Sequence, residues 1–270
     1  MASADRPRAG RQGIGWGLRI WVVLVAALLL APTLVVIPMS FSASETFEFP
    51  PREWSLRWYE EFFSSHAWMS SVLNSLQIGL LTAVLATAVG VAAAIGLDRT
   101  GFRGREMLRS AAMAPMIVPG IVVAVAIYGT FLRWQLNGTL LGFVLAHTVL
   151  ALPFVVTSVA TSLAGYDRVV ETAAASLGAS WWTTFRKVTL PLLAPGVASG
   201  FVFAFVVSLD EVMIALFLQT PDIRTLPVQM YNSITLEIDP TIAAASSLIV
   251  AITTIALLLP QLVRRRRSES

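Results

Sequence analysis

Long apolar runs separated by short polar segments extend along most of the chain. Six of these runs carry at most two charged residues, and each is long enough to cross about 30 Å of hydrocarbon as a helix that rises roughly 1.5 Å per residue. The pattern predicts an all-α polytopic membrane protein with six transmembrane helices. The predicted spans are 20–41, 72–97, 110–132, 139–163, 192–218 and 241–263.

The distribution of basic residues predicts how these spans are oriented. Of the 19 Lys and Arg residues, 15 lie before the first span, after the second, after the fourth or after the sixth. Loops on the cytoplasmic side of a membrane carry the excess of Lys and Arg. We therefore expect a cytoplasmic N-terminal tail over 1–19, a transmembrane domain over 20–263 with a long cytoplasmic loop at 164–191, and a basic cytoplasmic tail over 264–270.

Composition supports the membrane class and argues against several kinds of chemistry. The chain is 56% hydrophobic and 13% charged, whereas a soluble domain carries about 25% charged residues. It contains no cysteine, and His66 and His147 are too far apart for a zinc motif. It also lacks the Gly-x-x-x-x-Gly-Lys-[Ser/Thr] loop that binds ATP phosphates. We expect no cofactor, no metal site, no catalytic site and no ATP hydrolysis by this chain alone.

Two adjacent acids, Asp210 and Glu211, interrupt the fifth apolar run. A carboxylate near the centre of a membrane helix costs about 2.5 to 3.5 kcal/mol on insertion scales, so such residues face protein or a polar path. At roughly 1.5 Å per residue, Asp210 is expected about 27 Å beyond position 192, in the outer half of the span. Neighbouring residues of a helix point about 100° apart. We therefore expect Asp210 to face a solute path and Glu211 to face a partner subunit or the outer mouth.

The favoured interpretation of Asp210 is a counter-charge for a cationic amine, and the alternative is a structural ion pair. The predicted spans contain no Lys or Arg, so such a pair would need Arg133, Arg224 or another subunit. Four aromatic side chains are expected near the same outer level, as cation–π partners or as an interfacial belt. They are Tyr128, Phe131, Trp134 and Tyr231.

The loop at 164–191 has a helical pattern of its own. A first short helix is predicted after Asp167, and Gly178 suits the left-handed conformation that ends a helix. Ser180 can cap a second short helix, and Pro191 then starts the fifth span. A surface of this kind docks on a partner protein or lies in the membrane interface. Its apolar positions are Val170, Ala173, Ala174 and Leu177 in the first helix and Trp181, Phe185 and Val188 in the second.

The segment Glu171-Thr-Ala-Ala, followed by Gly178, Phe185 and Leu190-Pro191, resembles the EAA motif of ATP-binding-cassette (ABC) importer permeases. Thr172 stands where that family usually has alanine. The resemblance covers nearly the whole chain and implies the type I ABC importer permease fold in the inner (cytoplasmic) cell membrane. It also implies that the loop docks in a groove of an ATPase subunit. The coupling residues that it implies are Glu171, Ala173, Ala174, Leu177, Gly178, Trp181, Phe185 and Pro191.

Shorter segments look like spermidine/putrescine importer permeases, and more specifically like the second of two permease subunits. This resemblance implies ATP-driven import of a small cationic solute by alternating access. It further implies two copies of an ATP-binding subunit, a second homologous permease and an extracytoplasmic solute-binding protein. Nucleic acid is not an expected partner, and the basic tail is expected to contact membrane lipid. The segments are Asn74-Ser75-Leu76, Ser208-Leu209-Asp210-Glu211, Thr225-Leu-Pro-Val-Gln-Met-Tyr231 and Asp239-Pro240.

Two other functions share some of these features. Related ABC permeases carry ferric iron, thiamine, phosphonates or opines. An ion-coupled secondary carrier would use Asp210 and Glu211 as its ion site, although such carriers commonly contain inverted repeats and the chain shows no convincing internal repeat. The sequence alone leaves open which solute is carried and whether a partner permease sets the specificity.

Overall fold

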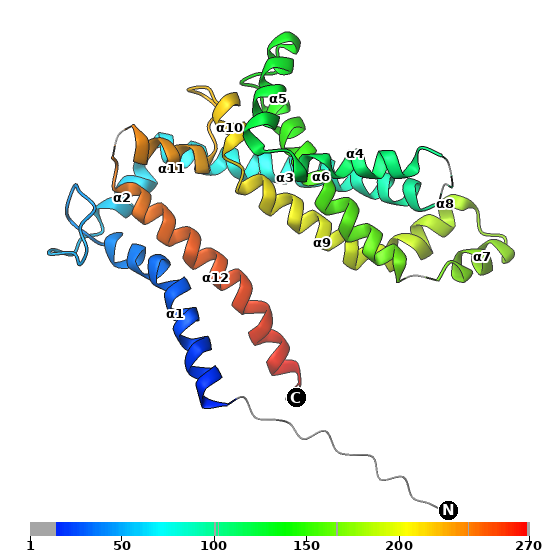
Figure 1. Cartoon of the computed structure of the whole chain (residues 1–270), viewed down its shortest axis with the longest axis horizontal. Coiled ribbons are helices and arrows are strands. Elements are labelled where there is room, and N and C mark those ends of the chain that lie inside the picture. The colour runs from blue at the N-terminus through cyan, green and yellow to red at the C-terminus, as the bar shows by residue number, and fades with distance from the viewer. Residues whose placement is uncertain (1–14, 100, 102, 166, 237, 269–270) are drawn as a thin grey trace, which may run out of the picture. The chain divides into compact units, whose positions relative to one another are not determined.

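The computed structural model describes residues 15–268 apart from 100, 102, 166 and 237, and only the backbone of 256–268. Its regular elements are helices (Figure 1). They belong to two compact units, Met1–Phe62 with Ile238–Ser270, and Phe63–Glu237. The first unit contains α1 (Trp16–Met39), most of α2 (Arg57–Ser64) and α12 (Thr241–Ser268). The second contains α3 (His66–Arg99), α4 (Arg105–Ile117), α5 (Gly120–Trp134), α6 (Leu140–Ala164), α7 (Val169–Ser176), α8 (Trp181–Thr184), the π-helical turn η1 (Phe185–Thr189), α9 (Leu190–Leu209), α10 (Met213–Leu218) and α11 (Leu226–Thr235).

Four described helices are long and apolar enough to cross a membrane. They are α1, α3, α6 and the continuous helix Trp181–Leu209, and they correspond to the first, second, fourth and fifth predicted spans. The pair α4 and α5 passes the same test together, while the described apolar part of α12, Thr241–Ile255, is shorter. The all-α membrane fold is therefore confirmed, and the count of six spans stays a prediction.

The third predicted span, 110–132, is not straight, because the chain bends by 106° between α4 and α5. Val118 lies at the bend with a ψ of 133°, outside the helical region. A residue before proline is pushed toward the extended conformation, and Pro119 itself has no N–H to continue a helical ladder. The sharp bend follows directly from this Val-Pro pair.

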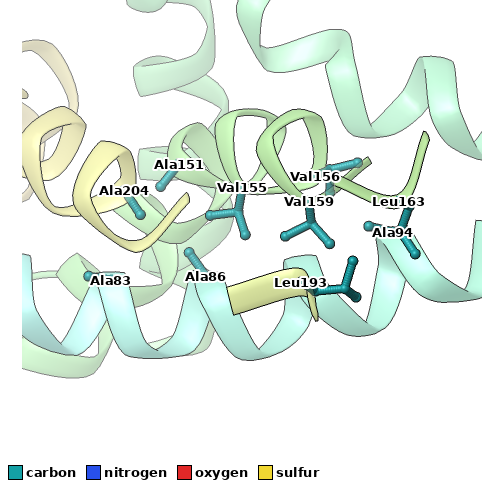
Figure 2. Close-up of a cluster of buried hydrophobic side chains, with 10 residues drawn as sticks. All are labelled: Ala83, Ala86, Ala94, Ala151, Val155, Val156, Val159, Leu163, Leu193 and Ala204. Atoms are coloured by element: carbon teal, nitrogen blue, oxygen red, sulfur yellow. The ribbon is translucent and has the colours of Figure 1, made fainter. Parts of the chain in front are cut away.

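The core of the second unit lies where α3, α6 and α9 pack on one another, and alanine and valine side chains fill it (Figure 2). Val155 of α6 lies at its centre and is fully buried. A Cβ atom on Gly90 of α3 would be 2.6 Å from Cγ1 of Val155, and one on Gly200 of α9 would be 3.2 Å from it. The two glycines let the three backbones approach closely, as small residues do in membrane helices.

In the first unit, hydrogen-bonded hydroxyl groups connect the end of α1, α2 and α12. The Tyr59 hydroxyl lies 2.7 Å from Oγ of Ser40, just after α1, and 2.6 Å from Oγ of Ser247 in α12. Ser40 and Ser247 are buried, so these bonds satisfy polar groups that would otherwise be costly in an apolar setting. Through Tyr59, the end of α1 is connected to α12, and Tyr59 and Ser247 are 188 residues apart in sequence.

Candidate functional site

The loop between α6 and α9 turns sharply at Gly178. After α7, the Gly178 N–H donates to the Ala175 carbonyl at 2.9 Å, and the Ala179 N–H donates to the Ala174 carbonyl at 3.1 Å. Gly178 has a φ of +83°, in the left-handed region that residues with a Cβ rarely adopt. The predicted left-handed end of the first loop helix is confirmed.

The second loop helix continues directly into the fifth predicted span. Ser180 caps α8 by accepting a hydrogen bond from the Thr183 N–H at 3.3 Å, as the sequence predicts. Together α8, η1 and α9 form one helix of 29 residues, Trp181–Leu209, so the predicted new start at Pro191 is wrong. Pro191 has no N–H to donate, and the wider π turn that precedes it lets the helix pass the proline without ending.

Aromatic side chains gather at the start of this long helix. Trp181 stacks on Phe185 with ring centroids 5.6 Å apart and an interplanar angle of 6°. Trp182 lies against the same ring, also at 5.6 Å. Both tryptophans remain mostly exposed, at 66% and 59%. A rigid cluster of aromatic side chains that stays exposed on the protein surface is typical of a contact surface.

The apolar face predicted on the first loop helix is only partly formed. Leu177 lies beyond the end of α7 and is 89% exposed. Ala173 is exposed and Ala174 is half-buried. Because the helix stops at Ser176, the predicted i to i+7 stripe loses its last member to the turn. The exposed large apolar residues of the loop, called the loop surface below, are Val169, Val170, Leu177, Trp181 and Trp182.

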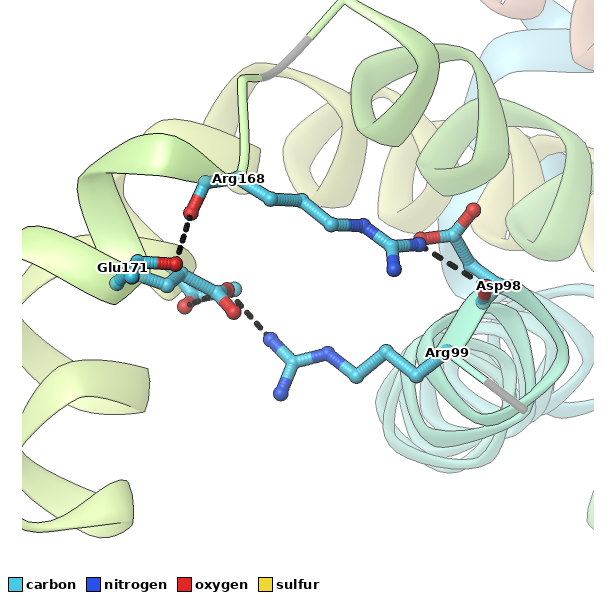
Figure 3. Close-up of polar contacts among 6 residues, drawn as sticks. Asp98, Arg99, Arg168 and Glu171 are labelled. Carbon is cyan, nitrogen blue, oxygen red and sulfur yellow. Dashed lines mark hydrogen bonds and ion pairs between the residues drawn. The ribbon is translucent and has the colours of Figure 1, made fainter. Parts of the chain in front are cut away.

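Two ion pairs join the loop to the end of α3 (Figure 3). Nη2 of Arg99 lies 2.5 Å from Oε1 of Glu171, and this oxygen also accepts a hydrogen bond from the Thr189 hydroxyl at 2.6 Å. Arg168 pairs with the carboxylate of Asp98 and donates to the Asp98 backbone carbonyl at 3.0 Å. We call Asp98, Arg99, Arg168 and Glu171 the polar clamp.

Sequence analysis identified Glu171 but missed the other three clamp residues. A signal was present, because opposite charges are adjacent at 98 and 99 and three residues apart at 168 and 171. Basic residues in the last turn of a helix and acids in the first turn are favoured by the helix dipole. This signal accounts for Arg99 at the end of α3 and Glu171 in the first turn of α7, but not for Asp98 or Arg168. It does not show that the loop folds back onto α3.

Asp210 and Glu211 lie where the fifth span is interrupted. Asp210 is the exposed residue that ends α9, and its N–H donates to the Val206 carbonyl at 3.0 Å. Oε1 of Glu211 accepts a hydrogen bond from the Ile214 N–H at 2.6 Å, at the start of α10. The prediction of a continuous helix through 218, with the acids about 100° apart around it, is therefore wrong. Side-chain bonds to nearby backbone N–H groups compete with a helical ladder, and Glu211 makes such a bond.

Neither acid forms an ion pair within the part of the chain that the structure describes. Arg224, one predicted partner, instead donates to Oε1 of Gln229 at 2.7 Å. Arg133 lies in the last turn of α5. The alternative of a structural ion pair with a basic residue of this chain therefore finds no support in the described residues.

A buried polar contact beside the break was missed by sequence analysis. Nδ1 of His147 in α6 lies 2.7 Å from Oγ of Ser208, in the last turn of α9. Both residues are buried. The contact holds the end of α9 against α6, directly before Asp210. The available signal was a histidine within an apolar span, because a buried polar side chain is expected to find a hydrogen-bond partner.

The four aromatic residues predicted at the outer level divide between two places. Tyr128 of α5 contacts Phe217 of α10 with ring centroids 5.9 Å apart. Phe131 stacks with Trp134 at 6.2 Å, also on α5. Tyr231 is 47% exposed on α11, which packs against α3. The structure thus brings Tyr128 to the segment that follows the acids and places Tyr231 on a different helix.

The loop surface and the two acids lie at opposite ends of one helix. The 29 residues of Trp181–Leu209 span about 43 Å at roughly 1.5 Å per residue, which exceeds the hydrocarbon thickness of a membrane. A continuous backbone therefore connects the loop to the break at Asp210. This arrangement suits a molecule that couples an event on one side of a membrane to a site near the other.

Known proteins provide close matches to the chain. Residues 86–269 match the family model described as "binding-protein-dependent transport system inner membrane component". The chain is 30% identical to the spermidine/putrescine transport system permease protein PotC of Haemophilus influenzae, over 92% of this chain and 96% of that protein. It is 33% identical to the putrescine transport system permease protein PotI of Escherichia coli, over 86% of this chain and 85% of that protein. A chain of a bacterial ABC transporter involved in alginate import has a similar fold, with a TM-score of 0.68, 16% identity and coverage of 94% of this chain and 98% of that one.

Proposed function

The chain belongs to the family of binding-protein-dependent transport system inner membrane components, and from its similarity to PotC and PotI we propose that it imports the small polyamines putrescine and spermidine. The chain is a transport permease subunit and not an enzyme. The similarity to PotC and PotI extends over most of the chain and supports the proposed solute class. ATP hydrolysis takes place on a separate subunit.

The unpaired carboxylate of Asp210 is the observation that carries the proposed solute class. An ammonium group that leaves water needs a counter-charge, and an exposed carboxylate at a helix break supplies one. The end of α9 adds partial negative charge from its last carbonyl groups. Glu211 contributes a second acid beside it. Together these groups favour a cation over an anion or a neutral solute.

We propose that the loop surface lies in the cytoplasm, together with both termini, and docks on the ATP-binding subunit. The excess of Lys and Arg on that side of the sequence supports this orientation. The fixed turn at Gly178 and the exposed aromatic group support docking. The complete importer contains two ATP-binding subunits, this chain with a second homologous permease, and a solute-binding protein on the outer side.

In the proposed mechanism, the continuous helix Trp181–Leu209 connects the ATP-binding subunits to the solute path. Closure of the ATP-binding subunits moves the docked loop, and the helix carries this movement to the break at Asp210. The path then opens outward, the binding protein releases its solute, and Asp210 receives the ammonium group. ATP hydrolysis returns the loop and opens the path inward, which is alternating access between two states.

The charge of Asp210 is tested by the variant Asp210→Asn in the complete importer, reconstituted into vesicles. We expect uptake of labelled putrescine to fall about tenfold or more, because a hydrogen bond to a charged group is worth about 1.5–3 kcal/mol. The affinity of the binding protein for the solute should not change, since that site is on another chain. Asp222→Asn is the matched control, because it removes an exposed acid after α10 and should leave uptake unchanged.

Wild-type uptake by Asp210→Asn, with normal assembly, excludes this carboxylate as a solute ligand. Loss of assembly in Asp210→Asn instead identifies a structural ion pair with another subunit. Absence of putrescine and spermidine uptake by the wild-type importer excludes the proposed solute class.

A further inference from the structure

We propose that the polar clamp makes α3 a second receiver of the ATPase movement, so that α7, α3 and α9 move together during transport. In this proposal Asp98, Arg99, Arg168 and Glu171 are positioning residues, which act through the helices that they join. The inference rests on the proposed docking of the loop surface. It adds a role for α3, which the EAA resemblance does not include.

The charges of the clamp are arranged in opposite order on its two sides. The end of α3 presents Asp98 and then Arg99, whereas the loop presents Arg168 and then Glu171. Each acid meets the base of the other side, as Figure 3 shows. Two adjacent pairs of opposite polarity resist both sliding and rotation of α7 against α3, which a single pair does not.

Arg168 also holds the backbone of α3. Its guanidinium donates to the Asp98 carbonyl at 3.0 Å as well as to the Asp98 carboxylate. Carbonyl groups in the last turn of a helix have no partner within that helix. Arg168 supplies such a partner from the loop, so a displacement of α7 pulls on the main chain of α3 and not only on a flexible side chain.

Glu171 extends the same connection to the long helix that contains α9. Its Oε1 accepts from Arg99 of α3 and from the hydroxyl of Thr189 in η1. Thr189 is fully buried and the Glu171 side chain is 20% exposed, so this carboxylate faces the inside of the loop. The geometry assigns Glu171 to an internal junction of three elements, while the loop surface provides the outward contacts.

Other basic side chains near Asp98 determine how the clamp must be tested. Arg105 and Arg109 of α4 line the same cavity as Asp98, with a volume of about 240 Å³. Either arginine is available to a carboxylate that loses Arg168. Neutralising Arg168 therefore leaves Asp98 with alternative partners, whereas a charge reversal places two acids opposite each other.

The experiment uses the complete importer in lipid vesicles, with Arg168→Asp, Asp98→Arg and the double reversal. We expect each single reversal to retain the ATP-binding subunit and to lower putrescine imported per ATP hydrolysed about two- to fivefold, the scale of a partly exposed ion pair. The double reversal should restore most of this ratio, and Arg168→Lys should keep it. Glu106→Arg is the matched control, because it reverses an exposed acid in the first turn of α4 and should leave the ratio unchanged.

Two results overturn the proposal. One is a wild-type import ratio in both assembled single reversals. The other is a double reversal that assembles and binds the ATP-binding subunit but stays as poorly coupled as the single variants. If a single reversal fails to assemble, the import ratios of the double reversal and of Arg168→Lys still test the clamp.

Gly178→Val separates failure of the clamp from failure of loop docking. A β-branched residue is strained at a φ of +83° and displaces the loop surface, so we expect the ATP-binding subunit to be lost from the purified importer. Retention of that subunit with normal uptake in Gly178→Val rejects the docking function itself. Loss of the subunit in Gly178→Val, together with normal coupling in the clamp variants, rejects only the clamp.

Discussion

At the scale of single residues, Val155 is enclosed by glycines on two neighbouring helices. Gly90 and Gly200 approach its side chain so closely that the position of a Cβ on either would be 3.2 Å or less from Cγ1. Lipid is as apolar as a valine side chain, so burial from water contributes little to association of membrane helices. Van der Waals contact between the helix surfaces therefore stabilises the packing, and these glycines allow that contact.

We predict that Gly90→Ala lowers the melting temperature of the purified importer. Its new methyl group would lie 2.6 Å from Cγ1 of Val155, and such overpacking costs about 1–3 kcal/mol. Gly96→Ala in the same helix is the matched control, because nothing lies within 4 Å of its Cβ position. There the change should be neutral or stabilising by roughly 0.5–1 kcal/mol. Thermal unfolding in detergent compares the two variants, and equal stability would argue against close packing at Gly90.

The sequence predicts the conformation and hydrogen bonds of single residues well where these depend on near neighbours in the chain. The left-handed turn at Gly178 and the cap at Ser180 depend only on neighbours within a few positions, and both are confirmed. The pair between Asp98 and Arg168 spans 70 residues. This pair forms only because the loop folds back onto α3, and rules based on neighbouring residues do not predict that contact. The contact between His147 and Ser208 was missed for the same reason.

At the scale of elements, the continuity of α8, η1 and α9 makes the loop part of the fifth span. We predict that replacing Arg186 and Lys187 together by glycine lowers putrescine uptake while the ATP-binding subunit stays bound. Each glycine costs about 1 kcal/mol relative to alanine within a helix and allows the backbone to bend there. Replacement of the same two residues by alanine is the control, because it removes the same charges and keeps the helix stiff. Equal uptake in the two double variants would contradict transmission through this helix.

Hydropathy predicts where apolar elements lie but not where they break. The third predicted span continues as apolar sequence through the 106° bend between α4 and α5, and the fifth continues through the end of α9. Both breaks occur inside runs that a sliding average treats as uniform. The Val118-Pro119 pair contained a readable signal for the first break. The second depends on whether the carboxylate of Glu211 caps a new helix, and an isolated sequence does not decide this.

At the scale of the whole molecule, the orientation of the chain is open to a direct test, because it contains no cysteine. We predict that Thr46→Cys and Asp222→Cys react with a membrane-impermeant maleimide added to intact cells. Ser176→Cys should react only after the membrane is permeabilised, because the positive-inside bias places its loop in the cytoplasm. All three positions are exposed. Labelling of Ser176→Cys in intact cells would reverse the proposed orientation and remove the basis for docking on a cytoplasmic ATPase.

Composition and the EAA-like spacing predicted the membrane class and the permease family correctly. They did not predict that the first and last long helices belong to a unit of their own. That arrangement depends on contacts such as the one between Tyr59 and Ser247, which are 188 residues apart. Contacts between distant segments follow from three-dimensional packing, and the apolar pattern of each segment is compatible with several partners.

The open space beside Gly178 has a consequence for the proposed docking of the loop. Nothing lies within 4 Å of the position that a Cβ on Gly178 would take, so no neighbour presses the turn into shape. Its own backbone hydrogen bonds, the Ser180 cap and the stacked rings hold it. The surface is therefore preorganised. Association with the proposed partner therefore costs this chain little conformational entropy.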